Sequence, residues 1–430
     1  MIARAACGFL LLIAAAALLI LPSPLRRIVQ LPPGILYLQS EMAVGSGIAL
    51  RGAPAGTVLR FAPGFSGRAL IVVKGSDVEL RDFSIEGDRD SSPERSGLPP
   101  YDTPFARFTR GNGVLAEGVT HLRIDNVRFR QLAGFAVLVS RSRDVAIDRV
   151  QVRDSGARNA AGRNNTTGGI LLEEGTQAFR VTRCELRNIR GNGIWTHSLY
   201  TSPRNADGVI AQNRFAMLGR DAIQVGHATD VRVEDNAGRS IGFPAEDVDV
   251  EGRAVPVAID TAGNVDRSTY VNNRFEEITG KCIDLDGFHD GEIRGNVCRN
   301  SNYGIVMNNT NPDMQSRNIR VVENTIDGAL FGGVFVIGRD HLVAHNRLRN
   351  LNTAHCNEGT VCYYAPGEPD MLRSGIYLGR GAERPAPARG NLIEDNEIQG
   401  FQMKTRCIAN APGVLPEWNV LRNNRCESRW

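Results

Sequence analysis

The sequence predicts an all-β fold, a single-stranded parallel β-helix (solenoid) of about thirteen coils. From Ala69 onward one phrase recurs at intervals of about 22 to 29 residues, which is the range of solenoid repeats. Within the phrase apolar residues alternate with a period of two, so the coils consist of strands and not helices. The chain also has 46 Gly, and all its Asn residues lie from Asn112 onward, as expected if both residue types serve regularly spaced turns.

Composition excludes two classes of protein. With 42% hydrophobic and 23% charged residues, the chain can bury a large core and is not intrinsically disordered. The 50 Lys and Arg residues nearly balance the 47 Asp and Glu residues, and no long basic run occurs, so we expect no nucleic-acid partner. We expect a monomer.

Residues 1–30 differ from the rest of the chain. Arg4 precedes an apolar run over 5–21, and Pro22, Arg26 and Arg27 follow it. This pattern is typical of an export signal or, if uncleaved, of a short membrane anchor; a buried helix is the alternative. We therefore expect an exported protein, periplasmic, extracellular or anchored facing outside, with residues 31–430 forming a β-helix domain with an N-terminal cap.

Each coil begins with a first strand in which a small residue precedes an inward aliphatic residue. These first strands are expected at 169–173, 193–197, 222–225, 258–261, 282–286, 304–306, 333–335, 375–377 and 407–409. The second half of the phrase supplies an inward column: Val127, Val150, Cys184, Asn213, Asn236, Asn273, Asn296, Asn324, Asn346, Asn396 and Asn424. Stacked at about 4.8 Å per coil, these asparagines can form a hydrogen-bonded ladder.

Four segments interrupt the repeat and are expected to project as loops. They are residues 87–112, 196–207, 243–255 and 352–371. Loops on a rigid scaffold often build binding surfaces, although insertions at the surface are also tolerated without function.

The cysteines predict a disulfide framework suited to an oxidising compartment. Cys282 and Cys298 occupy the same two positions in their coil as Cys407 and Cys426 do in theirs, which favours two pairs within coils. Cys356 and Cys362 would close a small loop, leaving Cys184 as an inert buried thiol. No CxxC spacing indicates a cysteine metal site.

The outward positions of the first strands gather acidic residues. The inward Ile of each strand places the residues one and three positions later on the outer face. One outward column reads Leu171, Trp195, Gln224, Asp260, Asp284, Val306, Phe335 and Tyr377, and the other reads Glu173, His197, Gly226, Ala262, Asp286, Asn308, Ile337 and Gly379. Asp260 and Asp284 therefore lie about 5 Å apart, with Asp286 about 7 Å along the strand.

Such a carboxylate cluster can supply an acid and a base, because like charges so close raise at least one pKa. We expect Asp284 and Asp260 to be the acid and base pair and Asp286 to tune their pKa values or bind water. His197 can orient a substrate or move a proton. The alternative is a solvated strand face or a structural ion site.

Further side chains of this face are candidates for substrate binding: Glu173, Trp195, Gln224, His227, His289 and Asn308. Trp195 offers a flat surface on which a sugar ring can stack, unless the 196–207 loop covers it. His227 and His289 come from the turns that leave strands next to the aspartates, where they can reach the cluster or simply shape the turn. Glu173 would serve a distal subsite.

The repeated phrase and the Asn column together resemble the right-handed parallel β-helix of the pectin-lyase-like superfamily, over roughly Ile35 to the C-terminus. The opening segments 32–35 and 46–52 are also similar to entry strands of that family. The three aspartates resemble, in layout only, its polygalacturonase-type hydrolases, whose Asn-Thr-Asp, Asp-Asp and Gly-His-Gly signatures are absent here.

The resemblance implies an exported enzyme that cleaves glycosidic bonds in a polysaccharide without a cofactor. The superfamily's lyases imply an alternative, a lyase or uronate epimerase with Ca²⁺ on Asp260, Asp284 and Asp286 and with Lys281 or Arg220 as base. Neither basic residue falls in an outward column. A second alternative is a β-helix that only binds glycans or serves as a spacer.

Overall fold

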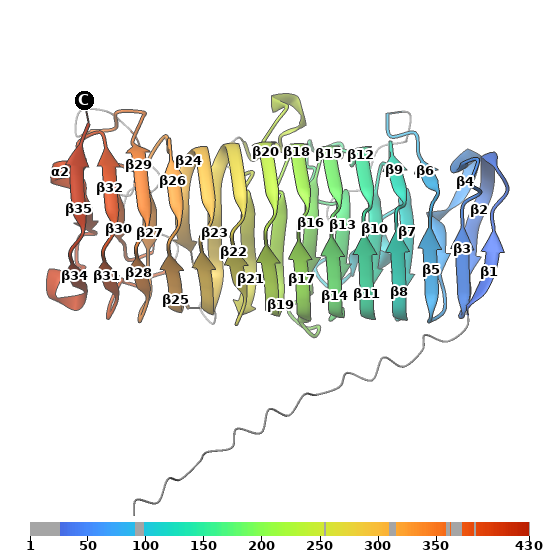
Figure 1. Ribbon diagram of the computed structural model, residues 1–430, viewed down its shortest axis with the longest axis horizontal. Coiled ribbons are helices and arrows are strands. Elements are labelled where there is room, and N and C mark those ends of the chain that lie inside the picture. The colour runs from blue at the N-terminus through green and yellow to red at the C-terminus, as the bar shows by residue number, and fades with distance from the viewer. Residues whose placement is uncertain are drawn as a thin grey trace, which may run out of the picture.

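The computed structural model describes residues 26–90, 99–252, 255–308, 315–357, 362, 372–381 and 384–429. These residues form one continuous rod of stacked coils (Figure 1). The predicted export signal or anchor falls mainly on residues 1–25, outside the described residues. Among the helices of the described part, none has the length and apolar character needed to cross a membrane.

Three parallel sheets run along the rod, and long strands bend from one sheet into the next. The first sheet contains β4 (Thr57–Val73), β7 (Asn112–Glu117), β10 (Phe135–Ser140), β13 (Gly168–Glu173), β16 (Asn192–His197), β19 (Ile223–Glu234), β21 (Ile259–Asp266), β23 (Arg274–Arg294), β24 (Val297–Asn308), β27 (Val334–Val336), β30 (Ile376–Leu378) and β33 (Ile408–Asn410).

The other two sheets complete each coil. The second contains β1 (Arg27–Gln30), β3 (Ile48–Arg51), β5 (Val78–Arg81), β8 (Thr120–Asp125), β11 (Arg143–Asp148), β14 (Gln177–Thr182), β17 (Asn205–Ala211), β22 (Thr269–Val271), β25 (Arg317–Val322), β28 (Leu342–Ala344), β31 (Leu392–Glu394) and β34 (Val420–Arg422), with parts of β19 and β23. The third contains β2 (Gly34–Val44), β6 (Ser84–Glu86), β9 (Arg128–Arg130), β12 (Gln151–Ser155), β15 (Glu185–Ile189), β18 (Arg214–Leu218), β20 (Ala237–Ile241), β26 (Thr325–Asp327), β29 (Arg347–Leu351), β32 (Glu397–Gly400) and β35 (Arg425–Ser428), with parts of β4, β23 and β24.

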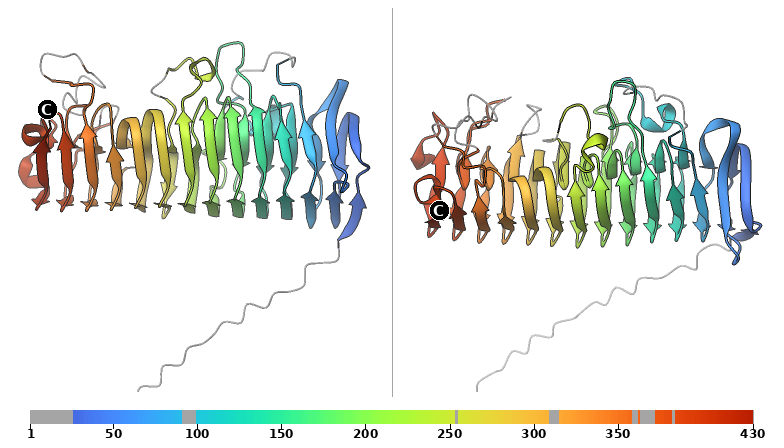
Figure 2. Two further views of the ribbon diagram at one scale, coloured as in Figure 1. Left: turned by 45° about the horizontal axis from the view of Figure 1, so that its top comes forward. Right: turned by 90° about the horizontal axis from the view of Figure 1, so that it is seen from above.

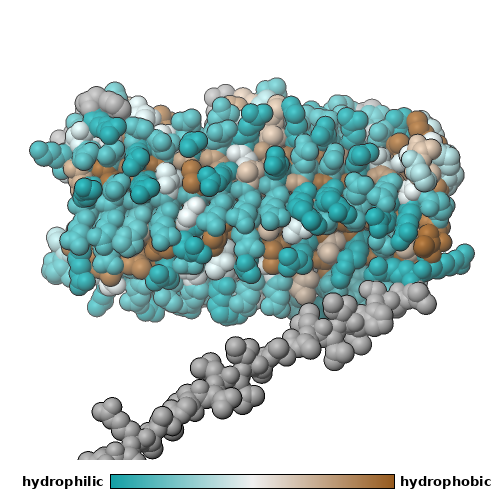
Figure 3. Space-filling view, viewed as in Figure 1, coloured by the Kyte–Doolittle hydropathy of each residue, from teal (hydrophilic) through white to brown (hydrophobic). Residues whose placement is uncertain are grey.

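The core is a stack of aliphatic residues inside the coils. The inward residues of successive first strands, such as Ile194, Ile223 and Ile283, are fully buried. The face viewed in Figure 3 is covered mainly by hydrophilic side chains. This division is what period-two alternation requires when one side of each strand faces the core.

The asparagine column forms the predicted ladder. From Asn213 to Asn396 each Nδ2 donates to the Oδ1 of the next asparagine at 2.9–3.0 Å and to a backbone carbonyl, and the last, Asn424, donates to the Ile393 carbonyl. At the N-terminal end of the ladder the backbone amide of Cys184 donates to Asn213 Oδ1 at 2.9 Å. The ladder satisfies polar groups in the coil interior that would otherwise be costly to bury.

The cysteine pairing is as predicted. Disulfides join Cys282 with Cys298, Cys356 with Cys362, and Cys407 with Cys426, with Cα atoms 6.1, 5.8 and 5.7 Å apart. Cys184 is a free thiol in the core, and burial raises its pKa to about 12, so it is inert as a nucleophile at neutral pH.

Insertions project from one side of the rod (Figure 2). The first carries α1 (Phe105–Phe108), and the insertion after β20 carries the short 3₁₀ helix η1 (Ala245–Asp247). α2 (Met403–Arg406) and η2 (Pro416–Trp418) lie in the last coil. A further insertion between β12 and β13, residues 156–167, was not expected from the sequence.

Candidate active site

The register of the first sheet brings the predicted aspartates together. Asp260 of β21 is paired with Asp284 of β23, and Asp286 lies beside Ala262. Gln224 of β19 precedes Asp260 in the same column, and Val306 follows Asp284. Both outward columns proposed from the sequence are therefore confirmed over these coils.

A cavity of about 360 Å³ opens at this cluster. Its lining consists of Arg220, Asp221, Val255, Val257, Asp260, Thr261, Ala262, Lys281, Asp284, Asp286 and Tyr303. Lys281 and Arg220 thus line the same cavity as the three aspartates, although the expected columns placed both basic residues away from this face. That expectation was wrong because the outward columns included only the residues one and three positions after the inward Ile, and both basic residues precede it.

Lys281 and Asp221, which the outward columns omit, lie at the corner that leads into each first strand. In successive coils the residue two positions before the inward aliphatic residue is Asn192, Asp221, Val257, Lys281 or Tyr303. Strict alternation would point these positions inward, but the bend before the strand turns several of them toward the outer face. A polar residue at this position in several coils, within an otherwise apolar repeat, was a signal available in the sequence.

A chain of two amides fixes the orientation of Asp260. Asn192 Nδ2 donates to Gln224 Oε1 at 2.7 Å, so the amide nitrogen of Gln224 faces the other way. That nitrogen, Nε2, donates to Asp260 Oδ2 at 2.7 Å. Because Oδ2 accepts this bond, a proton on the Asp260 carboxyl is held on Oδ1.

The neighbouring Asp284 has different partners. Its Oδ2 forms an ion pair with Lys281 Nζ, and its Oδ1 accepts a hydrogen bond from the Leu285 amide at 3.1 Å. Burial raises the pKa of Asp284, and Lys281 opposes that rise. For Asp260, burial and the charges of Asp221 and Asp284 raise the pKa well above its usual value. The two environments therefore favour the proton on Asp260 and the charge on Asp284.

Asp221 is a further carboxyl group in the lining of this cavity. Its side chain is buried, and its Oδ1 accepts a hydrogen bond from the Val257 amide at 2.9 Å. Burial raises the pKa of Asp221 to about 6, with the charge of Asp284 acting in the same direction. The cavity thus holds three carboxyl groups, Asp221, Asp260 and Asp284, whose pKa values are all raised and which compete for protons.

Two insertions meet beside Arg220 at the edge of the cavity. Arg220 Nη1 lies 3.4 Å from Asp249 Oδ2, which also accepts a hydrogen bond from the Asn164 amide at 3.0 Å. Arg163 lies 3.1 Å from the other oxygen of Asp249. Residues 156–167 and the insertion that contains Asp249 are thereby joined, and their contact holds Arg220 at the rim.

Trp195 and Glu173 do not form the open subsite expected for them. Trp195 is only 8% exposed, and Phe105 of α1 packs on it with ring centroids 5.0 Å apart. Glu173 is completely buried and accepts the backbone N–H groups of Phe105 and Ala106 at 2.9 and 2.8 Å. The insertion that contains α1 therefore covers this end of the sheet, whereas the sequence interpretation named the 196–207 loop as the cover for Trp195.

The remaining candidates lie outside the cavity lining. His197 precedes Asp286 by three coils in its column, about 14 Å at the strand spacing, so it cannot exchange a proton with the aspartates directly.

His227 is buried against Tyr200, with ring centroids 4.1 Å apart. His289 binds Asp290 and Asn264 at 3.0 and 3.1 Å in its turn. Asn308 lies beside Asp286 in the next coil.

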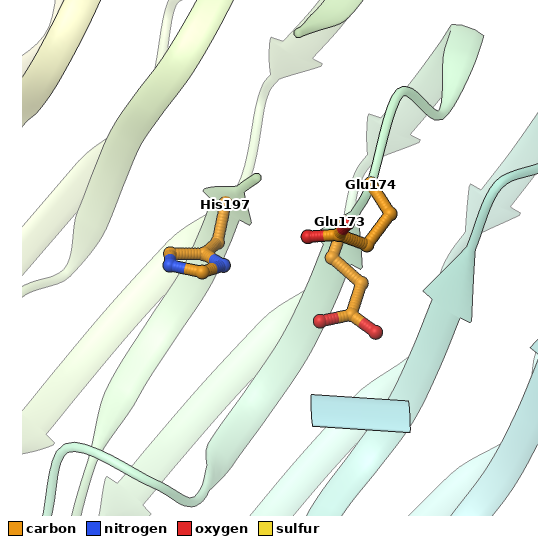
Figure 4. A group of neighbouring side chains, drawn as sticks. All are labelled: Glu173, Glu174 and His197. Atoms are coloured by element: carbon orange, nitrogen blue, oxygen red, sulfur yellow. The ribbon is translucent and has the colours of Figure 1, made fainter. Parts of the chain in front are cut away.

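One cluster within the described ranges has the geometry of a metal site, and it is not the aspartate cluster. Ligand atoms of Glu173, Glu174 and His197 lie within 4.8 Å of one another (Figure 4). Carboxylate oxygens of Asp260, Asp284 and Asp286 are not gathered within that distance, and oxygens of the first two bind Gln224 and Lys281. A Ca²⁺ ion shared by the three aspartates, as the lyase alternative implies, stays a prediction.

Comparison with known proteins agrees with the fold. The family model described as "Right handed beta helix region" matches residues 71–242. No curated protein sequence matches the chain. A surface adhesin of Streptococcus pneumoniae, PfbA, superposes with a TM-score of 0.54 at 14% identity, covering 75% of this chain and 82% of the adhesin.

Two further solved structures share the architecture. Gene product 12 of bacteriophage phi29 has a TM-score of 0.60 at 12% identity; the match covers 88% of this chain but only 49% of the phage chain. A variant of the periplasmic alginate epimerase AlgG has a TM-score of 0.50 at 13% identity, covering 94% and 84%. Together with the register of its three parallel sheets, these matches show that the chain has the right-handed parallel β-helix fold.

Proposed function

We propose that this protein cleaves glycosidic bonds of a polysaccharide by acid and base catalysis in the cavity at Asp260 and Asp284. One observation carries the proposal. Two adjacent aspartates line one cavity, and their fixed partners differ: an amide on Asp260 and an ammonium group on Asp284. Glycoside hydrolysis needs such a pair of carboxyl groups in different protonation states.

The partners assign the roles. Asp260, protonated on Oδ1, donates its proton to the oxygen of the departing sugar. Asp284, kept ionised by Lys281, acts on the sugar carbon or on the attacking water. Asp286 projects from the same strand as Asp284 and lines the cavity, where it can hold that water. Asp221 supports the acid role, because its charge raises the pKa of Asp260.

A second function, a polysaccharide lyase or uronate epimerase, is favoured by a specific observation. Lys281 and Arg220 line the cavity, so a base and a cation that could bind a uronate carboxylate lie beside the carboxyl groups. In that reaction the base removes the proton next to the uronate carboxyl group. The ion pair of Lys281 with Asp284 argues for the hydrolase, since a protonated Lys281 cannot accept that proton.

Other features are compatible with this proposal. Three disulfides suit an exported protein that meets polysaccharides outside the cytoplasm. The same fold is found in an alginate epimerase and in an adhesin, so architecture alone does not decide between catalysis and binding. We retain a monomer and the absence of a nucleic-acid partner as predictions.

A panel of neutral and uronate-containing polysaccharides tests the proposal, with Asp284→Asn as the inactive control. New reducing ends without ultraviolet absorbance would support a hydrolase. New reducing ends that carry the absorbance of an unsaturated uronate would identify a lyase. Inversion at a uronate carbon without cleavage would identify an epimerase, and tight binding without any turnover would identify a binding protein.

A further inference from the structure

We propose that Glu173, Glu174 and His197 form a binding site for a transition-metal ion of the Zn²⁺ type, which joins two insertions to the rod. The three side chains come from the ends of two adjacent first strands, β13 and β16. One ring nitrogen of His197 faces the two carboxylates (Figure 4). The site lies away from the aspartate cavity, and its existence does not depend on the proposed function.

Two adjacent buried carboxyl groups without a cation are the first observation. Glu173 and Glu174 are 0% and 4% exposed, and their side chains are adjacent. No Lys or Arg among the residues described forms an ion pair with either carboxylate. Burying one unpaired carboxylate is costly, and burying two side by side is more so. A divalent cation would neutralise both.

The unused nitrogen of His197 is the second observation. Its Nδ1 atom is buried and has no hydrogen-bond partner in the described part of the chain. The imidazole is held by Phe105 and Trp195, with ring centroids 5.2 and 5.1 Å away.

The carboxylates also have lone pairs left for a metal. The two oxygens of Glu173 each accept one backbone N–H, from Phe105 and Ala106. Those of Glu174 accept the Leu199 amide at 2.9 Å and the Ser202 hydroxyl group. Each oxygen can accept a second interaction, and the existing bonds orient the ligands as partners around a metal site usually do.

The donor set and distances favour Zn²⁺ over Ca²⁺. One imidazole with two carboxylates is a donor set that suits zinc, whereas calcium takes six to eight oxygens. Zinc bonds of about 2.0–2.2 Å place tetrahedral ligands about 3.4 Å apart. The ligand atoms lie within 4.8 Å of one another. Side-chain rotations that move these atoms about 1 to 1.5 Å closer together would bring them to the spacing of zinc ligands.

Such an ion would connect separate parts of the chain. Glu173 holds the insertion that contains α1, and Glu174 holds the loop that contains Leu199 and Ser202. Both carboxylates would bind one ion together with His197 of the next coil. The cover over Trp195 would therefore be fixed by metal as well as by packing.

Equilibrium dialysis of the purified full-length protein, first stripped with a chelator, tests the proposal. We expect one tightly bound zinc per chain and a rise in melting temperature on adding zinc. His197→Asn and Glu174→Gln should each weaken zinc binding at least about tenfold. The matched control is His121→Asn, because exposed His121 also lies beside two aspartates, at 3.0 and 3.6 Å, yet it should leave tight binding unchanged.

Two results would overturn the proposal. One is a wild-type protein that retains no zinc after dialysis, and the other is a folded His197→Asn variant that binds zinc as tightly as wild type. Should neither variant fold, Co²⁺ added to the stripped wild-type protein decides. Visible absorption bands of a low-coordinate Co²⁺ ion, removed by zinc, would support the site, and their absence would count against it.

Discussion

Replacing Glu173 with glutamine should change how stability depends on pH. Burial raises the pKa of Glu173 from 4.5 to about 7 in the folded protein without metal, and the charge of adjacent Glu174 acts in the same direction. Because the folded pKa is the higher one, the favourable contribution is complete below pH 4.5 and is lost as the pH rises through 7. A shift of about 2.5 pH units corresponds to about 3 kcal/mol.

Glu173→Gln lacks this titration but loses one hydrogen bond, since its amide NH₂ must face a backbone N–H of Phe105 or Ala106. That loss costs about 1 kcal/mol. In chelator, the variant should therefore be about 1 kcal/mol less stable than wild type at pH 4.5 and about 2 kcal/mol more stable at pH 7.5. Urea unfolding across this range measures the difference. Glu185→Gln, at a partly exposed carboxylate, is the control and should show no crossover.

A wild-type-minus-variant difference that stays constant from pH 4.5 to 7.5 would refute the reasoning. Other groups titrate in this window, including Asp221, but they are common to both proteins and cancel in the difference. With zinc present, wild type should instead gain stability as the pH rises, because metal binding displaces the proton.

Three further outcomes are expected. Phe105→Ala should lower the free energy of unfolding by about 3–5 kcal/mol, measured with urea, because it removes the ring packed on Trp195. Asn273→Ala, in the middle of the ladder, should cost about 2–4 kcal/mol, and Asn424→Ala, at its end, about 1 kcal/mol. Gln224→Leu should move the basic limb of the kcat/KM profile to higher pH, because the Gln224 hydrogen bond lowers the pKa of Asp260; an unmoved limb would exclude Asp260 as the acid.

The sequence was sufficient for the coil architecture because a solenoid repeats its contacts locally. A residue of the first strand meets its equivalent in the next coil, so the spacing of Ile259 and Ile283 already sets Asp260 beside Asp284. The Asn ladder and the disulfides follow from the same one-dimensional register. Side chains that follow strict strand alternation could therefore be placed correctly.

Features that depart from alternation or depend on distant segments could not be placed this way. Lys281 and Asp221 occupy corners, where the bend overrides the period of two. Glu174 follows β13 in a left-handed conformation with φ 57°, so it turns back toward Glu173. Trp195 is covered by Phe105, ninety residues earlier in the chain, and no local pattern encodes that contact.

The central claim, that the cavity at Asp260 and Asp284 is catalytic, is tested most directly by kcat/KM on a polysaccharide that the wild-type protein cleaves. Asp260→Asn and Asp284→Asn should each lower kcat/KM by at least about 100-fold, the usual contribution of a general acid or base. The partly exposed Asp144, paired with Arg123 on the second sheet, gives the control Asp144→Asn, which should retain activity. Two aspartate variants as active as wild type would contradict the assignment.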